Sequence, residues 1–273
     1  MIVDGKQLAD EIRQELKQKV EGSTKKMRLA VIAVGATKAT EQFMAQKKKF
    51  GESIGVNVRI YDLPEVITTT ALRKKISEIV HIKANTAVIV QLPLPLHIKV
   101  DYILDAIPVA KDADALSSRA MGLFAAGRGN TIPPVAGAIA HIFQKNNIDP
   151  KGQQAVVIGA GRLVGRPTAL WLMSQGATVT VCDENTQNTK AYTQGADIIV
   201  SGVGHSHLIT SDMAKDGVIA IDAGASESHG HIVGDMDPVI AEKASLFTPV
   251  PGGVGPLTIA ILFQNLVSLG AGK

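Results

Sequence analysis

The sequence predicts an α/β protein of two domains, each built around a parallel sheet. Three observations lead to this class. Short apolar runs typical of buried strands alternate along the chain with longer segments of helical periodicity. A glycine-rich turn at residues 159–165 follows one apolar run and precedes a helical pattern. The length of 273 residues leaves room for two compact cores.

Residues 1–134 form the first predicted domain. A helix is expected after Asp4-Gly5, because apolar residues recur at fourfold spacing from Leu8 to Val20. Strand and helix then alternate, with strands expected at 29–34, 56–61 and 87–91 and helices at 40–54 and 69–80. Residues 108–134 are rich in turn signals and carry few periodic ones, so they mark the end of this domain.

Residues 135–256 form the second predicted domain. The expected elements are a helix over 135–146 and strands over 155–158, 177–182, 197–200 and 218–222. The passage from Thr248 to Pro256 has too many prolines and glycines to be helix or strand. A C-terminal helix over 257–270 follows, and we assign it to the first domain.

The glycine-rich turn predicts a phosphate-binding cradle. The strand ends at Gly159, and Pro167 opens the helix. Glycines let the backbone approach a pyrophosphate closely, and the N-terminal end of a helix favours an anion. The spacing is one residue longer than the usual dinucleotide motif, and the alternative is an ordinary turn of an α/β protein. The cofactor-binding residues expected in the cradle are Gly159, Gly161, Arg162, Leu163, Val164 and Gly165.

The following strand strengthens the nucleotide interpretation. Residues 177–182 lead into Asp183 and Glu184, and Asp183 stands 24 positions after Gly159 (183 − 159). An acidic residue about 20 positions beyond the first glycine binds the ribose hydroxyls in dinucleotide-binding domains. The second domain is therefore predicted to be of the Rossmann type.

Composition limits the partners and the compartment. The net charge of +3, from 28 basic and 25 acidic residues, is too small a surplus to indicate nucleic acid. Cys182 is the single cysteine, which excludes an internal disulfide and fits a reducing compartment. No N-terminal signal pattern is found, and no apolar run approaches the roughly 18 residues of a membrane span. The sequence therefore predicts a cytoplasmic protein with no membrane partner.

Several unusual stretches lie where predicted strands end, which is where open α/β sheets bind ligands. Together they resemble one known family, the bifunctional methylenetetrahydrofolate dehydrogenase/methenyltetrahydrofolate cyclohydrolases. The resemblance covers essentially the whole chain in the same order. The matching pieces are Val3-Asp-Gly-Lys6, Val34-Gly35, the helix of Lys47, Gln91-Leu-Pro-Leu-Pro95, Lys111-Asp-x-Asp114, Val164-Gly-Arg-Pro167, Ile221-Asp-x-Gly224, Gly234-Asp235 and the long motif from Thr248 to Thr258.

The resemblance implies an activity and an active site in a cleft between the domains. The family oxidises 5,10-methylenetetrahydrofolate with NAD or NADP and hydrolyses the methenyl product to 10-formyltetrahydrofolate. Lys47 matches the lysine that handles protons in the hydrolysis, Gln91 the glutamine beside it, and Asp114 the carboxylate that binds the pterin. The substrate-binding positions implied in the same way are Phe43, Pro251, Gly252 and Gly253. Taken singly, Lys47, Gln91 and Asp114 also fit plainer roles as a solvated lysine, a strand end and a turn cap.

The chain departs from the family pattern around the folate pocket. Phe43 replaces a tyrosine, so the ring can stack on the folate but the hydroxyl is lost. Ala115-Leu116-Ser117 stands where the family usually has Gly-Phe-His, Val135-Ala-Gly-Ala138 replaces the family's Thr-Pro-x-Gly, and Gly161 replaces a serine. Two alternatives therefore stand beside the folate enzyme. One is a paralogue acting on a different small substrate, and the other is a non-catalytic nucleotide-binding protein.

The residues after the second strand of the Rossmann-type domain bear on the choice of cofactor. Asp183 and Glu184 would repel a 2′-phosphate, which favours NAD over NADP. Arg162 is the counterargument, since a guanidinium can pair with a phosphate. Gly204 resembles a position of the family's loop near the nicotinamide and is a further expected cofactor contact.

Two expectations concern assembly and metals. The resemblance implies a homodimer formed through the second domain. His229 and His231, near Asp235 and Asp237, could be drawn as metal ligands, but this spacing in a glycine-bearing turn is more typical of a solvated hairpin. No metal is therefore expected.

Overall fold

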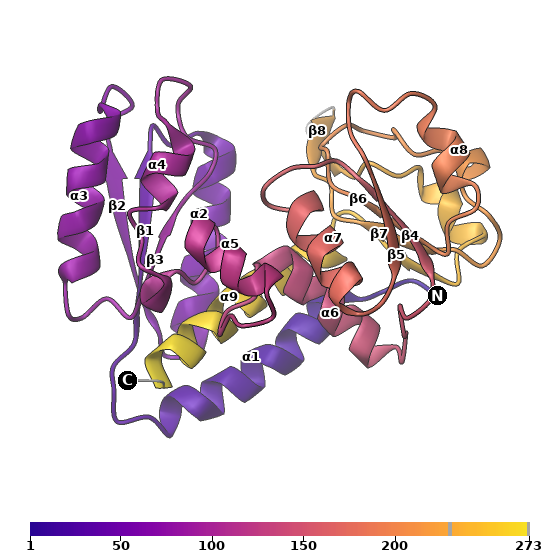
Figure 1. Ribbon diagram of the computed structural model, residues 1–273. Helices are drawn as coiled ribbons and strands as arrows, with labels where there is room; N and C mark the ends of the chain where they lie inside the picture. The colour runs from indigo at the N-terminus through magenta and orange to yellow at the C-terminus, as the bar shows by residue number, and fades with distance from the viewer. Residues whose placement is uncertain (229–230, 272–273) are drawn as a thin grey trace. The chain divides into compact units, whose positions relative to one another are not determined.

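The computed structural model describes residues 1–228 and 231–271, and the chain divides into two compact units (Figure 1). Unit 1 comprises Met1–Ala9 and Pro134–Thr258. Unit 2 comprises Asp10–Pro133 and Ile259–Lys273. Helices α1 (Gly5–Glu21) and α9 (Val254–Ala271) each contribute residues to both units.

Unit 2 contains a three-stranded parallel sheet in the order β2-β1-β3. Its parallel pairings confirm the predicted alternation of strands and helices. The strands are β1 (Arg28–Val34), β2 (Asn57–Leu63) and β3 (Ala87–Val90). The helices between and after them are α2 (Lys38–Ser53), α3 (Thr69–His81), α4 (Val100–Leu104), the 3-10 turn η1 (Val109–Lys111) and α5 (Ser118–Ala125).

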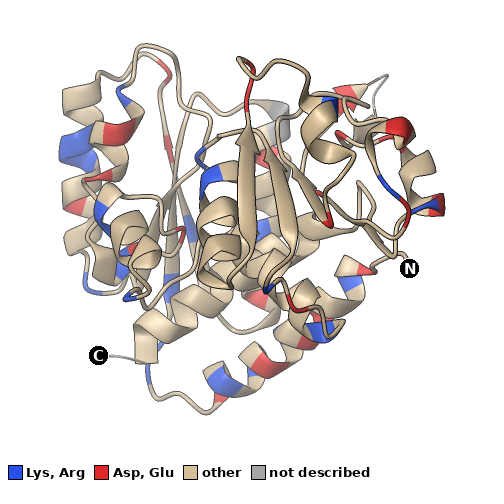
Figure 2. Ribbon diagram, turned by 45° about the vertical axis from the view of Figure 1, so that its right-hand side comes forward, with Lys and Arg blue, Asp and Glu red and all other residues tan. Residues whose placement is uncertain are grey.

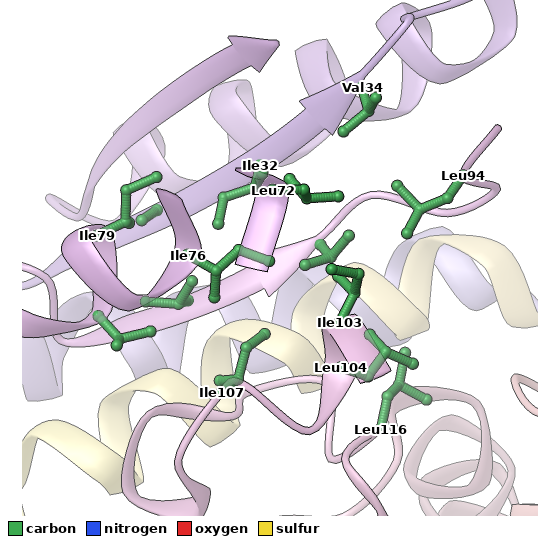
Figure 3. Packing of buried hydrophobic residues seen from close by; sticks show 14 of the residues in the cluster. Ile32, Val34, Leu72, Ile76, Ile79, Leu94, Ile103, Leu104, Ile107 and Leu116 are labelled. Carbon is green, nitrogen blue, oxygen red and sulfur yellow. The ribbon is translucent and has the colours of Figure 1, made fainter. Parts of the chain in front are cut away.

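The core of unit 2 lies where α3 and α4 pack on the sheet (Figure 3). Leu72, Ile76 and Ile79 recur on one face of α3 and are fully buried, as helical periodicity requires. Ile32 of β1 points to the same cluster. β3 is buried at every position, which is why it reads as a continuous apolar run rather than an alternating one.

The exposed face of α1 carries charges of both signs (Figure 2). Arg13 pairs with Asp10 at 3.1 Å, and Lys17 lies 3.9 Å from Glu21. Exposed pairs of this kind contribute little to stability. They describe a solvated helix face and not a basic stripe.

Helix α9 corrects one expectation from the sequence. Its 18 residues, with a mean hydropathy of 1.6, meet the length and composition of a membrane span, whereas no such run was expected. About half of the helix is buried within the protein, and a buried core helix passes the same test. Its Phe263 stacks on Phe50 with the ring centroids 5.2 Å apart, and a side chain at Gly51 would come within 2.9 Å of the Phe263 ring.

Unit 1 contains a five-stranded parallel sheet in the order β10-β7-β6-β4-β5. The strands are β4 (Gln154–Ile158), β5 (Thr178–Cys182), β6 (Ile198–Ser201), β7 (Ile219–Asp222) and β10 (Leu246–Thr248). The helices are α6 (Pro134–Lys145), α7 (Gly165–Ser174) and α8 (Thr189–Thr193), with 3-10 turns η2 (Ser211–Met213) and η3 (Pro238–Glu242). A separate antiparallel pair joins β8 (Ser226–Ser228) to β9 (His231–Val233).

The turn-rich passage at 108–134 contains a helix that the sequence did not predict. α5 is eight residues long and includes Gly122, so it shows too few turns for a clear period. Its start signal was present, because the Ser117 side chain accepts a hydrogen bond from the Ala120 N–H as an N-cap. The short elements α4 and β10 were likewise not expected, whereas the antiparallel pair of β8 and β9 agrees with the hairpin interpretation of the residues around His231.

Candidate active site

Lys47 and Gln91 meet at the carboxyl end of the unit 2 sheet. Lys47 lies on α2, and Gln91 follows β3 directly, with its N–H donating to Ile32 O at 2.8 Å. The Lys47 Nζ donates to Gln91 Oε1 at 2.7 Å. The Gln91 Nε2 donates to Leu92 O at 2.8 Å, so the amide presents its oxygen to the lysine. The sequence placed these two residues 44 positions apart, and the fold brings them into contact.

The helix that carries Lys47, α2, begins with a side-chain cap. Thr37 and Thr40 form a reciprocal capping box, with the Thr37 N–H donating to Thr40 Oγ1 at 2.8 Å. Lys47 is half-buried, whereas Lys48 and Lys49 are exposed. Burial lowers the pKa of Lys47, and the opposing effect of the Asp114 carboxylate is smaller. At a given pH, a larger fraction of Lys47 than of a solvated lysine is therefore the neutral amine, which can accept a proton.

Asp114 is the third member of this group in unit 2. The residue is half-buried overall, but its carboxyl group is enclosed by protein. Desolvation raises the pKa of Asp114 to about 6, with Lys47 lowering it and Asp112 raising it. Asp112 is buried and accepts hydrogen bonds from the Ser117 N–H at 2.9 Å and the Leu116 N–H at 3.4 Å. Asp112 therefore folds the loop that presents Asp114.

Asn265 on α9 supports the same loop, and the sequence did not single it out. Its Nδ2 donates to Ala113 O at 2.8 Å and to Ile132 O at 2.7 Å, and its Oδ1 accepts from the Ile132 N–H at 3.2 Å. Asn265 is buried. A polar amide in an otherwise apolar helix was the available signal, because such a group must find partners when it is buried.

Two departures from the family pattern can be placed in unit 2. Phe43 lies one helical turn before Lys47 and is 45% exposed, so its ring is open to a ligand. Ala115 adopts φ 54°, the left-handed region that favours glycine. The substitution of a family glycine by Ala115 therefore leaves the backbone shape in place at a cost in strain.

The cradle of unit 1 has the shape expected of a phosphate site. Gly159 adopts φ 97°, and a Cβ at Gly165 would overlap the carbonyl oxygen of Gly159. α7 begins at Gly165, two residues earlier than expected. Its N-cap residue is Val164, whose side chain makes no capping hydrogen bond. The loop from Gly161 to Val164 is exposed or half-buried. Backbone N–H groups at an uncapped helix start fit the pyrophosphate of a dinucleotide.

Asp183 and Glu184 lie at the carboxyl end of β5 and are exposed. Asp183 Oδ1 accepts from the Asn185 N–H at 2.9 Å and from Thr186 Oγ1 at 3.3 Å. These hydrogen bonds lower the pKa of Asp183 below its usual range. A carboxylate keeps further acceptor capacity beyond such bonds, so Asp183 can still accept from a ribose.

The remaining expected residues lie in two further loops of unit 1. Gly204 adopts φ 74° and is exposed in the loop after β6. Gly252 adopts φ 110° in the loop after β10, next to Pro251. The Gly5 N–H donates to Gly252 O at 3.0 Å, and a Cβ at Gly5 would overlap the carbonyl of Gly253.

The possible metal ligands do not converge within the described residues. Among residues 1–228 and 231–271, no group of three or more His, Cys, Asp or Glu side chains could hold a metal ion. His231 is exposed on β9, Asp237 caps η3, and Asp235 is fully buried. His229 lies outside the described residues.

Fold and site together define an α/β protein with one Rossmann-type unit for a dinucleotide and a second unit carrying a half-buried lysine–glutamine pair. Residues 3–114 match the tetrahydrofolate dehydrogenase/cyclohydrolase catalytic domain, and residues 133–271 match the NAD(P)-binding domain of the same proteins. The chain belongs to the tetrahydrofolate dehydrogenase/cyclohydrolase family, which confirms the resemblance found in the sequence.

Relatives of known name are similar over nearly the whole chain. The bifunctional protein FolD of Aquifex aeolicus (strain VF5) is 40% identical over 271 residues, covering 97% of this chain and 93% of the relative. The FolD crystal structure from Campylobacter jejuni has a TM-score of 0.96 at 38% identity, covering 100% of this chain and 99% of that one. The Trypanosoma brucei FolD structure, complexed with NADP and an inhibitor, has a TM-score of 0.93 at 29% identity, covering 98% and 96%.

Proposed function

We propose that this protein oxidises 5,10-methylenetetrahydrofolate to the 5,10-methenyl compound with NAD or NADP and then hydrolyses that compound to 10-formyltetrahydrofolate. The observation that carries the proposal is the Lys47–Gln91 pair, in which burial lowers the pKa of the lysine in a member of this family. The similar proteins from Campylobacter jejuni and Aquifex aeolicus are named as bifunctional enzymes.

Lys47 handles the protons of the hydrolysis. Water adds to the bridging carbon of the methenyl group, forming a C–O bond, and the neutral Lys47 amine accepts the proton that the water loses. The new hydroxyl group then loses its proton as the C=O bond forms and the bond from that carbon to N5 breaks. N5 takes up a proton, and the formyl group remains on N10. Gln91 holds Nζ in place through its 2.7 Å hydrogen bond. Asp114 binds the amino and ring N–H groups of the pterin, which are donors to a carboxylate.

Unit 1 binds the nicotinamide cofactor. When bound, the cofactor supplies the acceptor for the hydride that leaves the methylene carbon. The backbone of residues 159–165 holds the pyrophosphate, and Asp183 accepts from the ribose hydroxyls. Positioning of two flat ligands accounts for most of this step, because hydride transfer needs little acid or base chemistry. An active site between the two domains stays a prediction.

The proposed cofactor is NAD in preference to NADP. Asp183 and Glu184 are exposed at the end of β5, and the pKa of Asp183 is lowered, so this carboxylate is ionised at neutral pH. A 2′-phosphate placed beside two carboxylates meets repulsion, whereas a ribose hydroxyl donates to one. The Trypanosoma brucei relative was solved with NADP, so the acidic residues of this chain are the feature to test.

Two proposals about the state of the protein follow from the family. One is a homodimer formed through the NAD(P)-binding unit, for which the exposed edge strand β5 offers unpaired backbone groups. A sedimentation measurement that gives a concentration-independent monomer would rule it out. The other is a cytoplasmic location, in line with its single cysteine.

The decisive experiment follows absorbance of the reduced nicotinamide with 5,10-methylenetetrahydrofolate and either cofactor. Cofactor reduction, together with loss of methenyl absorbance in a separate hydrolysis assay, is the expected result. Tight cofactor binding without turnover of any folate would instead identify a nucleotide-binding protein. Cofactor reduction with another small substrate but not with folate would identify a paralogue of changed specificity, in line with Phe43 and Ala115.

A further inference from the structure

The strand order of unit 1 identifies two loops that share one edge of its sheet. β4 lies between β5 and β6 in the sheet. The chain therefore runs from β4 to its neighbour β5 on one side and then crosses over to β6 on the other side. Ligands of open α/β sheets bind at such a switch point, outside the carboxyl ends of the strands. The loop after β4 is the glycine cradle, residues 159–165. The loop after β6, residues 202–205, is named the β6 loop.

The β6 loop packs directly against the cradle. Its Gly202 N–H donates to Ile158 O, at the end of β4, at 3.2 Å. A Cβ at Gly159 would come within 2.7 Å of the Val203 side chain. A Cβ at Gly202 would overlap the side chain of Val164. Because neither glycine has room for a side chain, a shift of the β6 loop changes the shape of the cradle.

The buried carboxylate of Asp235 holds the β6 loop in this position. Its Oδ2 accepts from the Val203 N–H at 2.8 Å and from Ser201 Oγ at 2.7 Å, and its Oδ1 accepts from the His205 N–H at 2.8 Å. Asp235 is fully buried. Three donors within residues 201–205 therefore bind one carboxylate, which lies 30 to 34 positions later in the sequence.

The backbone around Asp235 is fixed in turn by the carboxylate of Asp222. The Asp235 N–H donates to Asp222 Oδ1 at 3.1 Å, and the Met236 N–H donates to Asp222 Oδ2 at 2.9 Å. The Asp222 N–H in turn donates to Thr248 Oγ1 at 2.7 Å. Gly224 and Gly234 are required here, because a Cβ on either would overlap one of the two carboxyl groups.

We propose that Asp235 is a positioning residue for the nicotinamide cofactor. It holds the backbone of the β6 loop against the cradle and so sets the shape of the cofactor-binding edge of unit 1. The proposal rests on the proposed function, because it presumes that a dinucleotide binds at this edge. Asp235 acts through the Val203 and His205 N–H groups and needs no contact with the cofactor.

The chemistry of the carboxylate suggests the variant. An ionised carboxylate accepts at both oxygens, whereas an asparagine has one accepting oxygen and an NH2 group. In Asp235→Asn the NH2 group would face the His205 N–H or the pair formed by Ser201 and Val203. At least one backbone donor of the β6 loop then loses its partner while side-chain volume is conserved.

The experiment compares Asp235→Asn with Asp237→Asn, the same change at a carboxylate that caps η3. NADH binding is titrated by fluorescence, the KM for cofactor and kcat are measured with 5,10-methylenetetrahydrofolate, and hydrolysis of the methenyl compound is followed separately. We expect Asp235→Asn to weaken NADH binding and raise the KM for cofactor about tenfold or more. Hydrolysis, which uses no cofactor, should stay at the wild-type rate, and Asp237→Asn should match the wild type throughout.

Unchanged NADH affinity in Asp235→Asn would overturn the proposal, and so would an equal loss of both activities. If that variant does not fold, Ser201→Ala decides, because it removes the hydroxyl that fixes Asp235 Oδ2 and so loosens the carboxylate that holds both loop N–H groups. A weakening of NADH binding by a few-fold is then expected, and unchanged binding would overturn the proposal. Failure of the wild-type protein itself to bind NADH or NADPH would instead contradict the proposed function.

Discussion

In unit 2 the candidate site consists of side chains that act on one another. Lys47 donates to Gln91 at 2.7 Å, and the charge of Asp114 raises the pKa of Lys47 against the larger effect of burial. In unit 1 it consists mainly of backbone, shaped by glycines at positions where a Cβ would overlap a neighbour. The acidic residues differ accordingly. Burial shifts the pKa of Asp114 beside a lysine, whereas Asp235 accepts two backbone N–H groups and a serine hydroxyl.

This difference predicts which measured property a substitution changes in each unit. Side-chain chemistry depends on the identity and the pKa of a few groups, so conservative changes there should alter rates and pH profiles. A backbone site depends on loop shape, so changes around it should alter cofactor affinity. If the two units are separable in this way, a substitution in one should spare the activity of the other.

The largest expected effect comes from Lys47→Met. Hydrolysis of the methenyl compound should fall by at least about a hundredfold, since the proton acceptor is lost and the side chain keeps its length. NADH affinity should not change. The rate is measured by loss of methenyl absorbance, with Lys48→Met as the control because that neighbouring lysine is exposed. Hydrolysis at the wild-type rate in Lys47→Met would rule out the proposed role.

A smaller effect is expected from the double change Asp183→Ser/Glu184→Arg. Replacing two carboxylates by a hydroxyl and a guanidinium should shift the ratio of kcat/KM for NADP to that for NAD upward by about tenfold or more. Hydrolysis of the methenyl compound should not respond. Tighter binding of NADP than of NAD by the unmodified protein would contradict the reading of Asp183 and Glu184.

Asp114→Asn tests the electrostatic coupling within unit 2 through pH. Ionised Asp114 raises the pKa of Lys47, so its removal should lower that pKa further. In the proposed role of Lys47, hydrolysis requires the neutral amine, so its rise with pH should begin at lower pH in the variant. The comparison is made above pH 6, because the pKa of Asp114 is about 6. A kcat profile at saturating substrate that is unmoved, or moved to higher pH, would refute the coupling.

The smallest effect is expected from Ala115→Gly, which restores the family residue. Ala115 has φ 54°, and glycine removes the steric penalty of this conformation while adding freedom to the unfolded chain. We expect the free energy of unfolding in urea to rise by roughly 0.5–1 kcal/mol. The matched change Ala125→Gly, at an exposed position of α5, should lower it instead. A loss of stability in Ala115→Gly would show that the strain is relieved in another way.

Local patterns predicted the regular elements well. The strand expected at 29–34 is observed as Arg28–Val34, and the helix expected at 69–80 as Thr69–His81. Both are long enough to show their period or their continuous burial. α5 and the three-residue strand β10 fell below that length, so no period could be recognised in them.

The expectation that no apolar run approaches the length of a membrane span was wrong because polar residues interrupt the run. The run at 254–271 is interrupted by Thr258, Gln264 and Asn265, so it does not read as continuously apolar, yet its average still meets the criterion for a span. The structure shows why the polar residue Asn265 is there. Its Nδ2 donates to Ala113 O, on the loop that presents Asp114, and to Ile132 O, in the segment after α5.

By itself the sequence determined the class of fold, the family and the residue types that could carry chemistry, because periodicity, glycine spacing and motifs are properties of neighbouring residues. It could mark Gly234-Asp235 as part of a matching motif but not say what Asp235 does. That was decided by the tertiary structure, since hydrogen bonds to Ser201, Val203 and His205 form only when β6 and the segment after β9 are packed together. The strand order and the Lys47–Gln91 contact have the same origin, because burial in a shared core, and not local spacing, brings distant polar groups within bonding distance.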